Sequence, residues 1–190
     1  MKITRIFFNR NTIQVAKEIL GCYLINKTRE GTTIGKIVET EAYLANDPAS
    51  HSFNGKTKRN EKMFAPPGKA YIYFTYGMHH CFNVVTRPKG IGEAVLIRAL
   101  EPISGIELMK KRRKTGDIHN FCNGPAKLVQ ALGIKKEMNG IDLTKGALKI
   151  TSGEDVSEKD IVKTKRVGIT KASNLKLRFY IKDNKFISRR

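Results

Sequence analysis

The chain has 190 residues and carries 36 Lys and Arg against 17 Asp and Glu, a formal net charge of +19. This length allows one well-buried core, and with no visible linker or repeat it predicts a single domain over residues 1–190. A positive charge of this size excludes a protein with an electrically balanced surface. Clustered Lys and Arg bind phosphates through counterion release, so the charge favours nucleic acid over an anionic membrane as the partner.

Cysteine usage and hydropathy indicate the compartment. Cys22, Cys81 and Cys122 are odd in number and far apart, so they offer neither a disulfide framework nor a CxxC metal pair. We expect three small buried thiols in a reducing compartment. No apolar run is long enough for a secretory signal or a membrane span. The protein is therefore expected to be cytoplasmic, and nucleoid-associated if its source is bacterial.

The first elements are a helix and two strands. Asn11 or Thr12 caps the predicted helix, and Gly21 ends it. Two strands follow, near Cys22–Asn26 and Thr33–Tyr43. In the second strand the period of two predicts that four side chains share one face, namely those of Ile37, Glu39, Glu41 and Tyr43.

Two carboxylates beside a phenol ring allow three interpretations. Glu39 and Glu41 could hold a metal ion together with Asp47 and His51, as in a metal-dependent nuclease. One of them could instead be a general base, because like charges and partial burial raise a carboxyl pKa. The third interpretation is ordinary surface charge on a strand.

A long loop and a predicted hairpin follow. Residues 44–69 are rich in turn residues, and their histidine and basic side chains favour a functional loop over a disordered one. Strands at Tyr71–Thr75 and Cys81–Thr86 flank a turn that places Tyr76 at the hairpin tip. An exposed aromatic ring at such a tip is able to enter a stack of nucleic-acid bases. Asn83, among apolar neighbours, needs hydrogen-bond partners or a ligand.

The second half of the chain contains further short elements. Arg98 lies within an apolar strand and is expected to meet a carboxylate or a phosphate, because a buried arginine needs a partner. Three further strands are predicted, at Glu93–Leu100, Arg166–Lys171 and Leu175–Ile181. One predicted helix begins with a capping box formed by Ser104 and Glu107. Another runs from Pro125 to Leu132, with Asn123 as its cap and Gly133 at its end. Residues 135–165 show no clear pattern. Interspersed strands and short helices predict an α+β fold, with a mixed or antiparallel curved sheet, surrounding short helices and a protruding β-hairpin.

Twelve stretches, taken in order, resemble the alkyladenine (3-methyladenine) DNA glycosylase family over the whole chain. They are Val38–Tyr43, Ala49–Ser52, Arg59–Asn60, Met63–Phe64, Pro67–Gly68, Tyr71–Tyr73, Tyr76–Met78, Asn83, Leu96–Pro102, Asn123–Leu128, Arg166–Gly168 and Leu177–Tyr180. The resemblance implies a monofunctional enzyme of base-excision repair. Such an enzyme flips alkylated or deaminated purines out of duplex DNA and hydrolyses the N-glycosidic bond, which leaves an abasic site. The implied substrates are 3-methyladenine, 7-methylguanine, hypoxanthine and ethenoadenine.

The resemblance also implies roles for individual residues. Glu41 matches the general base, and Arg98 matches the arginine that positions the water. The base pocket would consist of Tyr43, His51, Tyr73 and Asn83. Tyr76 matches the intercalating wedge, and the DNA-backbone contacts would be Thr57, Arg59, Met78 and Lys127. Glu39 keeps a structural role. No metal and no cofactor are required, and a monomer that binds damaged double-stranded DNA but no membrane is expected.

Two other classes of function remain open from the residues alone. A non-enzymatic RNA-binding or ribosome-binding module would explain the charge and the tyrosines, but not Glu41 facing inward beside Tyr43. A metal-dependent nuclease would use Glu39, Glu41 and His51. Activity on a damaged duplex in the presence of EDTA distinguishes these classes from a glycosylase.

Overall fold

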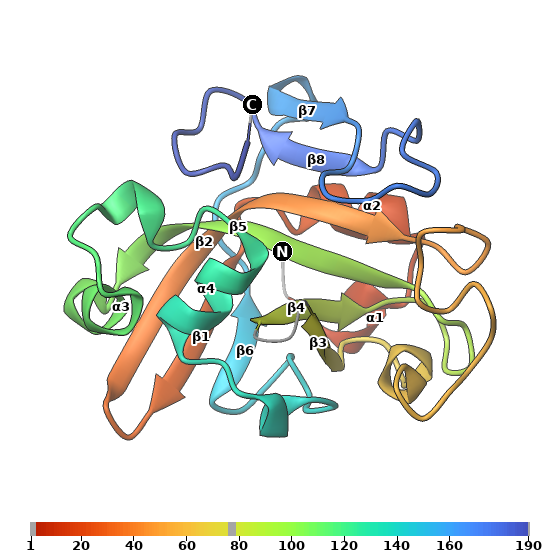
Figure 1. Ribbon diagram of the computed structural model, residues 1–190, viewed down its shortest axis with the longest axis horizontal. Helices are drawn as coiled ribbons and strands as arrows, with labels where there is room; N and C mark the ends of the chain where they lie inside the picture. The colour runs from red at the N-terminus through yellow and green to blue at the C-terminus, as the bar shows by residue number, and fades with distance from the viewer. Residues whose placement is uncertain (1–2, 76–78, 190) are drawn as a thin grey trace.

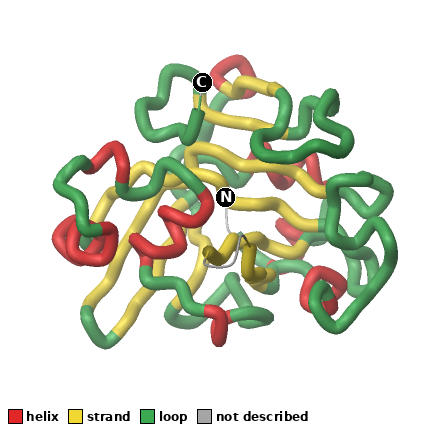
Figure 2. Tube along the Cα trace, viewed as in Figure 1, coloured by secondary structure: helices red, strands yellow, loops and turns green. Residues whose placement is uncertain are grey.

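The protein folds as a curled antiparallel sheet with short helices around it (Figures 1 and 2). The computed structural model describes residues 3–75 and 79–189. The main path of the sheet runs β3-β4-β5-β2-β1-β6, and β8 pairs with β2 and β7. The strands are β1 (Tyr23–Thr28), β2 (Gly31–Tyr43), β3 (Ala70–Thr75), β4 (His79–Val85), β5 (Ala94–Ser104), β6 (Leu148–Thr151), β7 (Ile161–Thr164) and β8 (Arg178–Ile181). The predicted α+β class with a curved antiparallel sheet is confirmed.

The long strand β2 organises the sheet, because it pairs with β1, β5 and β8. Its pairing with β5 extends from Ile34 opposite Ser104 to Tyr43 opposite Ala94. This register brings Arg98 of β5 next to the part of β2 that carries two glutamates. Residues in contact here are separated by more than fifty positions in the sequence.

A β-bulge changes the face that the period of two predicts for β2. The register with β5 shifts between Ile37 and Glu39, and again between Glu39 and Thr40. Ile37 consequently packs in the main hydrophobic core together with Ala42, whereas Glu39 and Glu41 both approach Arg98. The prediction that Ile37 shares a face with the two glutamates is therefore wrong, because an extra residue reverses the alternation.

The helices are short and lie at the periphery of the sheet (Figure 2). The side chain of Asn11 accepts hydrogen bonds from the amides of Ile13 and Gln14, so its predicted capping role is confirmed. Gly133, which has a left-handed φ of 67°, ends its helix as predicted. The α-helices are α1 (Arg5–Phe8), α2 (Thr12–Glu18), α3 (Ile106–Arg113) and α4 (Pro125–Leu132).

Two predicted helix caps are wrong. Ser104 ends β5, and Gly105 occupies the cap position of α3 with a φ of 75°. Gly124 caps α4 without a side-chain hydrogen bond, and the Asn123 side chain instead accepts one from Lys127 Nζ at 2.8 Å. At α3 the left-handed Gly105 turns the chain after the end of β5. At α4 the Asn123 side chain is engaged with Lys127 and does not reach the helix amides.

The C-terminal third differs most from the sequence prediction. Residues 166–171 form an irregular loop and not a strand, because Gly168 adopts a φ of 78° that interrupts an extended chain. The last predicted strand is shorter than expected and begins only at Arg178. The strands β6 and β7 lie within residues 135–165, where no pattern was visible.

Two hydrophobic clusters stabilise the fold. The larger one joins α1, α2 and α4 to the inner face of the sheet, and includes the fully buried Phe8 and Phe82. The smaller one consists of Met63, Tyr71 and two short side chains of β4 and β5, with Tyr43 and Tyr73 packed against it. This smaller cluster supports the walls of the cavity described below.

The predicted hairpin consists of β3 and β4, which pair from Ala70 opposite Val84 to Thr75 opposite His79. Its tip, Tyr76–Met78, lies outside the described residues. All three cysteines are buried, as predicted. Within residues 3–75 and 79–189, no helix is long and apolar enough to cross a membrane.

Candidate active site

Glu41 is a fully buried carboxylate that accepts two hydrogen bonds and has one arginine nearby. Its Oε2 accepts a hydrogen bond from the Tyr43 hydroxyl at 2.9 Å, and its Oε1 accepts one from the amide of Val167 at 2.9 Å. The nearest cation is Arg98, whose Nη1 lies 3.5 Å from Oε1. Burial raises the pKa of Glu41, and Arg98 and the two hydrogen bonds oppose that rise.

Glu39 is equally buried but much more strongly held. Its Oε1 accepts a hydrogen bond from Arg178 Nε at 2.6 Å, and its Oε2 accepts one from the Ser188 amide at 2.6 Å. The Ser188 hydroxyl donates to Oε1 at 2.9 Å. Arg98 Nε lies 3.3 Å from the same oxygen, so Arg98 is shared between Glu39 and Glu41. The prediction that Arg98 meets a carboxylate is confirmed.

A cavity of about 280 Å³ lies beside this charged cluster. Its volume is just below the range for sites that bind drug-sized molecules, about 300–1,000 Å³. Glu41 is fully buried and does not line the cavity, but its three contacts Tyr43, Arg98 and Val167 do. The other lining residues are Ala49, His51, Met63, Tyr71, Tyr73, Cys81, Asn83, Leu96, Pro125, Gly168 and Ile169.

Aromatic rings from three segments form much of the wall. The His51 ring meets the Tyr73 ring edge to face, with 4.4 Å between centroids, and Tyr71 lies 5.4 Å from Tyr73. His51 Nδ1 and the Tyr71 hydroxyl are 2.9 Å apart, which fixes the imidazole. Burial raises the pKa of Tyr71 to about 12 and lowers that of His51. These rings are therefore uncharged at neutral pH, and their faces suit a flat ligand.

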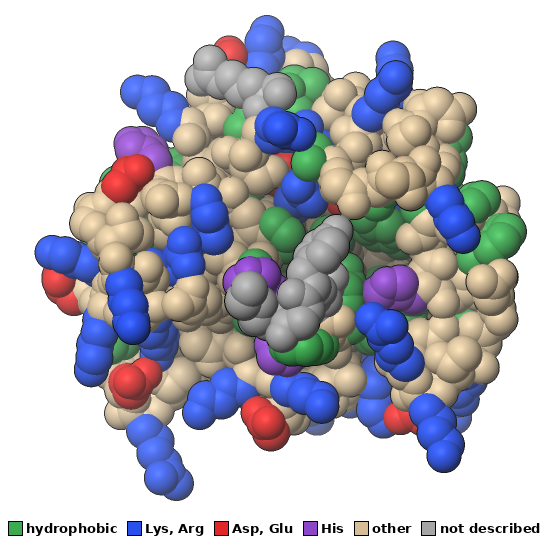
Figure 3. Space-filling model, in the orientation of Figure 1, with side chains coloured by type: hydrophobic (Ala, Val, Ile, Leu, Met, Phe, Trp, Pro, Cys, Tyr) green, Lys and Arg blue, Asp and Glu red, His purple; other side chains and the backbone are tan. Residues whose placement is uncertain are grey.

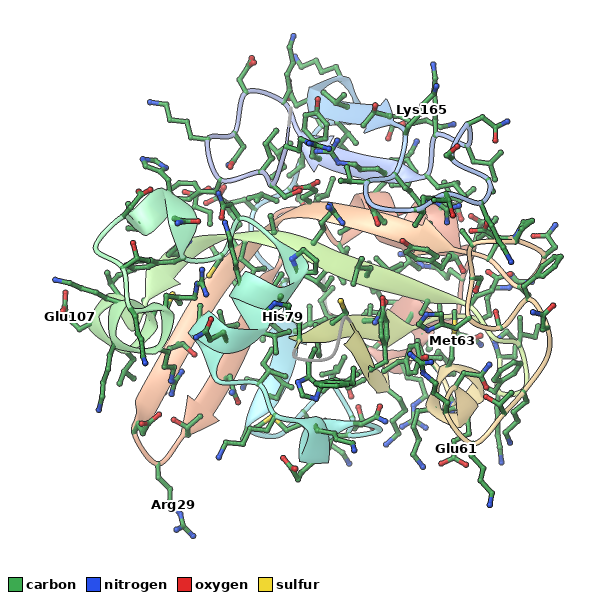
Figure 4. All side chains as sticks on the ribbon, viewed as in Figure 1. Arg29, Glu61, Met63, His79, Glu107 and Lys165 are labelled. Carbon is green, nitrogen blue, oxygen red and sulfur yellow. The ribbon has the colours of Figure 1, made fainter. Side chains whose placement is uncertain are left out.

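Asn83 projects from β4 and is almost completely buried. Its Nδ2 donates a hydrogen bond to the carbonyl oxygen of Tyr71 at 3.0 Å, which satisfies the expected need for a partner. Figure 4 labels Met63, in the short helix Glu61–Phe64, and His79, the first residue of β4. Met63 lines the cavity together with Tyr71 and Tyr73 of β3.

Three of the predicted DNA-backbone residues, Thr57, Arg59 and Lys127, do not line the cavity. Arg59 donates a hydrogen bond to the carbonyl oxygen of Phe74 at 3.3 Å, which ties its loop to the hairpin. Thr57 shares two hydrogen bonds with Asn60, and Lys127 binds the Asn120 and Asn123 side chains at the start of α4. The predicted wedge Tyr76 and the predicted contact Met78 lie outside the described residues.

A buried ion pair that the sequence did not reveal supports the cavity. Arg166 Nη2 donates to Asp47 Oδ1 at 3.0 Å, and the guanidinium lies 4.6 Å from the centroid of the Tyr43 ring. Both side chains of the pair are buried. The pair joins the loop that contains His51 to the loop whose Val167 amide binds Glu41. Only tertiary structure brings these segments together, 119 positions apart.

The four residues considered as metal ligands do not form one site, although Glu39 and Glu41 lie close to each other at Arg98. Asp47 binds Arg166, His51 binds Tyr71, and Glu39 binds Arg178 and Ser188. In the part of the chain that the structure describes, no group of three or more His, Cys, Asp or Glu side chains could hold a metal ion.

Basic side chains are spread over one face of the molecule. Figure 3 shows Lys and Arg side chains spread over the face that carries the hairpin, with few acidic side chains between them. A small aromatic cavity with a buried carboxylate next to it, on a face this basic, is typical of an enzyme that acts on a base of nucleic acid.

Comparison with known proteins identifies the family. The family model described as methylpurine-DNA glycosylase matches residues 6–185. A relative from Carboxydothermus hydrogenoformans is 54% identical over 191 residues, and one from Methanoculleus marisnigri is 52% identical over 193, each match covering 100% of both chains. A Francisella tularensis relative is 54% identical over 182 residues, 94% of each chain. All three relatives carry 3-methyladenine DNA glycosylase as a provisional name.

The chain therefore belongs to the methylpurine-DNA glycosylase family. It is a DNA glycosylase, an enzyme of DNA repair, and its partner is DNA. The RNA-binding module and the metal-dependent nuclease are left without support.

Proposed function

We propose that this enzyme removes alkylated and deaminated purines from duplex DNA, with 3-methyladenine, 7-methylguanine, hypoxanthine and ethenoadenine as substrates. The damaged nucleotide is flipped into the cavity, and the N-glycosidic bond is hydrolysed to leave an abasic site. Residues 1–190 act as one monomeric glycosylase domain without a metal or cofactor. The protein works in the cytoplasm, at the nucleoid in a bacterial cell.

The aromatic wall supports recognition of a damaged purine. Tyr43, His51 and Tyr73 all line the cavity, and the rings of His51 and Tyr73 are 4.4 Å apart. A purine methylated at N3 or N7 carries positive charge, and neutral π-faces attract such a ring more strongly than an undamaged one. Because the pKa of His51 is lowered by burial, its imidazole is neutral and does not repel a cationic base.

Asn83 supports exclusion of normal guanine. Its Nδ2 is held by the carbonyl oxygen of Tyr71, so the side chain has little freedom to move away from an incoming base. A fixed amide in the cavity would crowd the exocyclic amine of guanine, and this adds a repulsive element to the choice of substrate.

Glu41 supports the chemical step. In this step Glu41 takes a proton from water, the water oxygen forms a bond to C1′ of the sugar, and the glycosidic electron pair leaves with the base. The ionised carboxylate also stabilises positive charge that develops on the sugar. Burial raises the pKa of Glu41, which makes it a stronger base, and the Arg98 guanidinium favours its ionised form. Glu41 is fully buried, and the water reaches it from the cavity beside Arg98, which lines that cavity.

The basic face supports binding of the duplex. Thr57, Arg59, Met78 and Lys127 would contact the DNA backbone. Tyr76 would fill the gap that the flipped base leaves, because an empty gap costs a few kcal/mol of stacking. These assignments rest on the match to the family and on the charge of the surface in Figure 3.

The observation that carries the proposal is the buried Glu41, held by Tyr43, Arg98 and Val167 at the wall of an aromatic cavity. The test uses labelled duplexes with a single hypoxanthine, 7-methylguanine or ethenoadenine, incubated with the enzyme in EDTA and then treated with alkali. Strand breaks at the lesion after alkali, and not before, are expected. Absence of breaks at every lesion, or breaks that disappear specifically with EDTA, would refute the proposal.

A further inference from the structure

The segment that follows β8 returns to the charged cluster between β2 and β5. Ser188, in this segment, makes three hydrogen bonds there. Its amide donates to Glu39 Oε2 at 2.6 Å, and its hydroxyl donates to Glu39 Oε1 at 2.9 Å. The same hydroxyl accepts a hydrogen bond from Arg98 Nε at 3.0 Å. Ser188 Oγ is therefore a bridge between the shared arginine and the carboxylate that has no proposed chemical role.

Arg98 is placed between two competing carboxylates. Its Nε is 3.3 Å from Glu39 Oε1 and its Nη1 is 3.5 Å from Glu41 Oε1, so neither contact is a short ion pair. The only side-chain hydrogen bond that Arg98 makes within the described residues is the one to Ser188 Oγ. The position of the guanidinium thus depends on this hydroxyl.

We propose that Ser188 is a positioning residue, whose hydroxyl keeps Arg98 between Glu39 and Glu41 and prevents its collapse onto Glu39. This inference rests on the proposed function, because it takes Glu41 as the base and Arg98 as its partner. It assigns the segment after β8, far in the sequence from β2 and β5, to the geometry of the chemical step.

The consequence of losing the hydroxyl follows from the distances. Without Oγ, the nearest acceptor for Arg98 Nε is Glu39 Oε1 at 3.3 Å, and the approach of Nε to that oxygen draws Nη1 away from Glu41. The remaining groups that face Glu41 do not replace the lost cation. Tyr43 and Cys81 are neutral, Glu39 is negative, and Arg166 is engaged with Asp47.

The anchoring of the segment itself does not depend on the hydroxyl. The Ser188 amide bond to Glu39 remains in an alanine variant, and Arg178 also binds the carbonyl oxygen of Arg189. Ser188→Ala therefore removes the bridge and leaves two attachments of the segment in place. Ser188→Thr restores a hydroxyl at the same position. The exposed Ser173 provides a matched control for a serine-to-alanine change.

The test measures single-turnover excision of hypoxanthine from a duplex between pH 5 and pH 9 for the wild type, Ser188→Ala, Ser188→Thr and Ser173→Ala. At pH 6–7 we expect Ser188→Ala to be slower by roughly tenfold or more, the size of one charge-assisted hydrogen bond. The acid limb of its profile should move to higher pH, and the deficit should shrink above that limb. Binding of the lesion duplex should be unchanged, and Ser188→Thr should follow the wild type.

The outcomes separate the inference from the proposed function. A wild-type enzyme that excises no lesion refutes the proposed function. An active wild type with an unshifted acid limb in Ser188→Ala refutes the inference alone. A deficit that is equal at every pH and accompanies a lower unfolding temperature also refutes it, because Ser188 would then only stabilise the fold. A displaced acid limb with an unchanged affinity for DNA supports it.

Discussion

Replacement of Glu41 by Gln tests the centre of the proposed mechanism with little change in shape. Gln preserves the size of the side chain and keeps an oxygen for Tyr43 or Val167, but it cannot accept a proton from water. Loss of a general base typically costs about two to four orders of magnitude in rate. At about 1.36 kcal/mol for each factor of ten, this is roughly 3–5 kcal/mol of activation free energy.

Glu41→Gln should slow excision, but it should not lower the thermal stability of the folded protein. Burial raises the pKa of Glu41, so the folded protein binds a proton there more tightly than the unfolded chain does. The free energy of unfolding therefore falls as the pH rises from the ordinary carboxyl pKa to the raised pKa of Glu41. Above both values the folded protein is destabilised by the full free-energy cost of burying the ionised carboxylate. At pH 7–8, Glu41→Gln is expected to unfold at the same or a higher temperature than the wild type.

The assay combines single-turnover excision, binding of a lesion duplex and thermal unfolding. Glu137→Gln, an exposed change in the short helix at Lys136–Met138, is the control and should match the wild type in all three. Glu41→Gln should bind the lesion, excise it slowly and unfold no earlier. Excision within threefold of the wild type would remove Glu41 from the mechanism. A clearly lower unfolding temperature would refute the electrostatic account of the site.

Three further substitutions test the surroundings of the site. Asp47→Asn should lower the free energy of unfolding by about 3–5 kcal/mol, because Arg166 is then left buried without a counter-charge; a loss below 1 kcal/mol in urea unfolding contradicts this. Tyr76→Ala should weaken capture of the flipped state by about 1–3 kcal/mol, measured with a fluorescent base next to the lesion; unchanged capture means that Tyr76 is not the wedge. Lys127→Ala should reduce the slope of log affinity against log salt by about one for every sequence, which titrations at several salt concentrations measure; an unchanged slope excludes a phosphate contact.

The sequence predicted helix ends correctly where one residue determines the local backbone conformation. Asn11 caps its helix, and Gly133 ends another, because both act through contacts within a few residues. Ser104 failed as a cap because β5 continues to that position to pair with β2. The irregular loop at residues 166–171 was predicted as a strand, since its apolar alternation gave no indication of the turn at Gly168.

The site could be predicted only in part, for a related reason. The proximity of Glu41 and Tyr43 follows from their spacing of two on one strand, and the need of Arg98 for a carboxylate follows from its apolar neighbours. The contacts of Glu39 with Arg178 and Ser188 connect positions 139 and 149 residues apart. No local pattern encodes a contact at that separation, so Arg178, Ser188 and the Asp47–Arg166 pair appear only in the folded chain.

These long-range contacts distinguish two glutamates that are equivalent in the sequence. Glu39 has a short ion pair to Arg178, two hydrogen bonds from Ser188 and a share of Arg98, which together occupy both of its oxygens. Glu41 has a phenol, one amide and the more distant end of Arg98. An oxygen that already accepts several hydrogen bonds has little capacity left to hold a water molecule. Glu41, equally buried but with fewer donors, is therefore the carboxylate that we propose as the base.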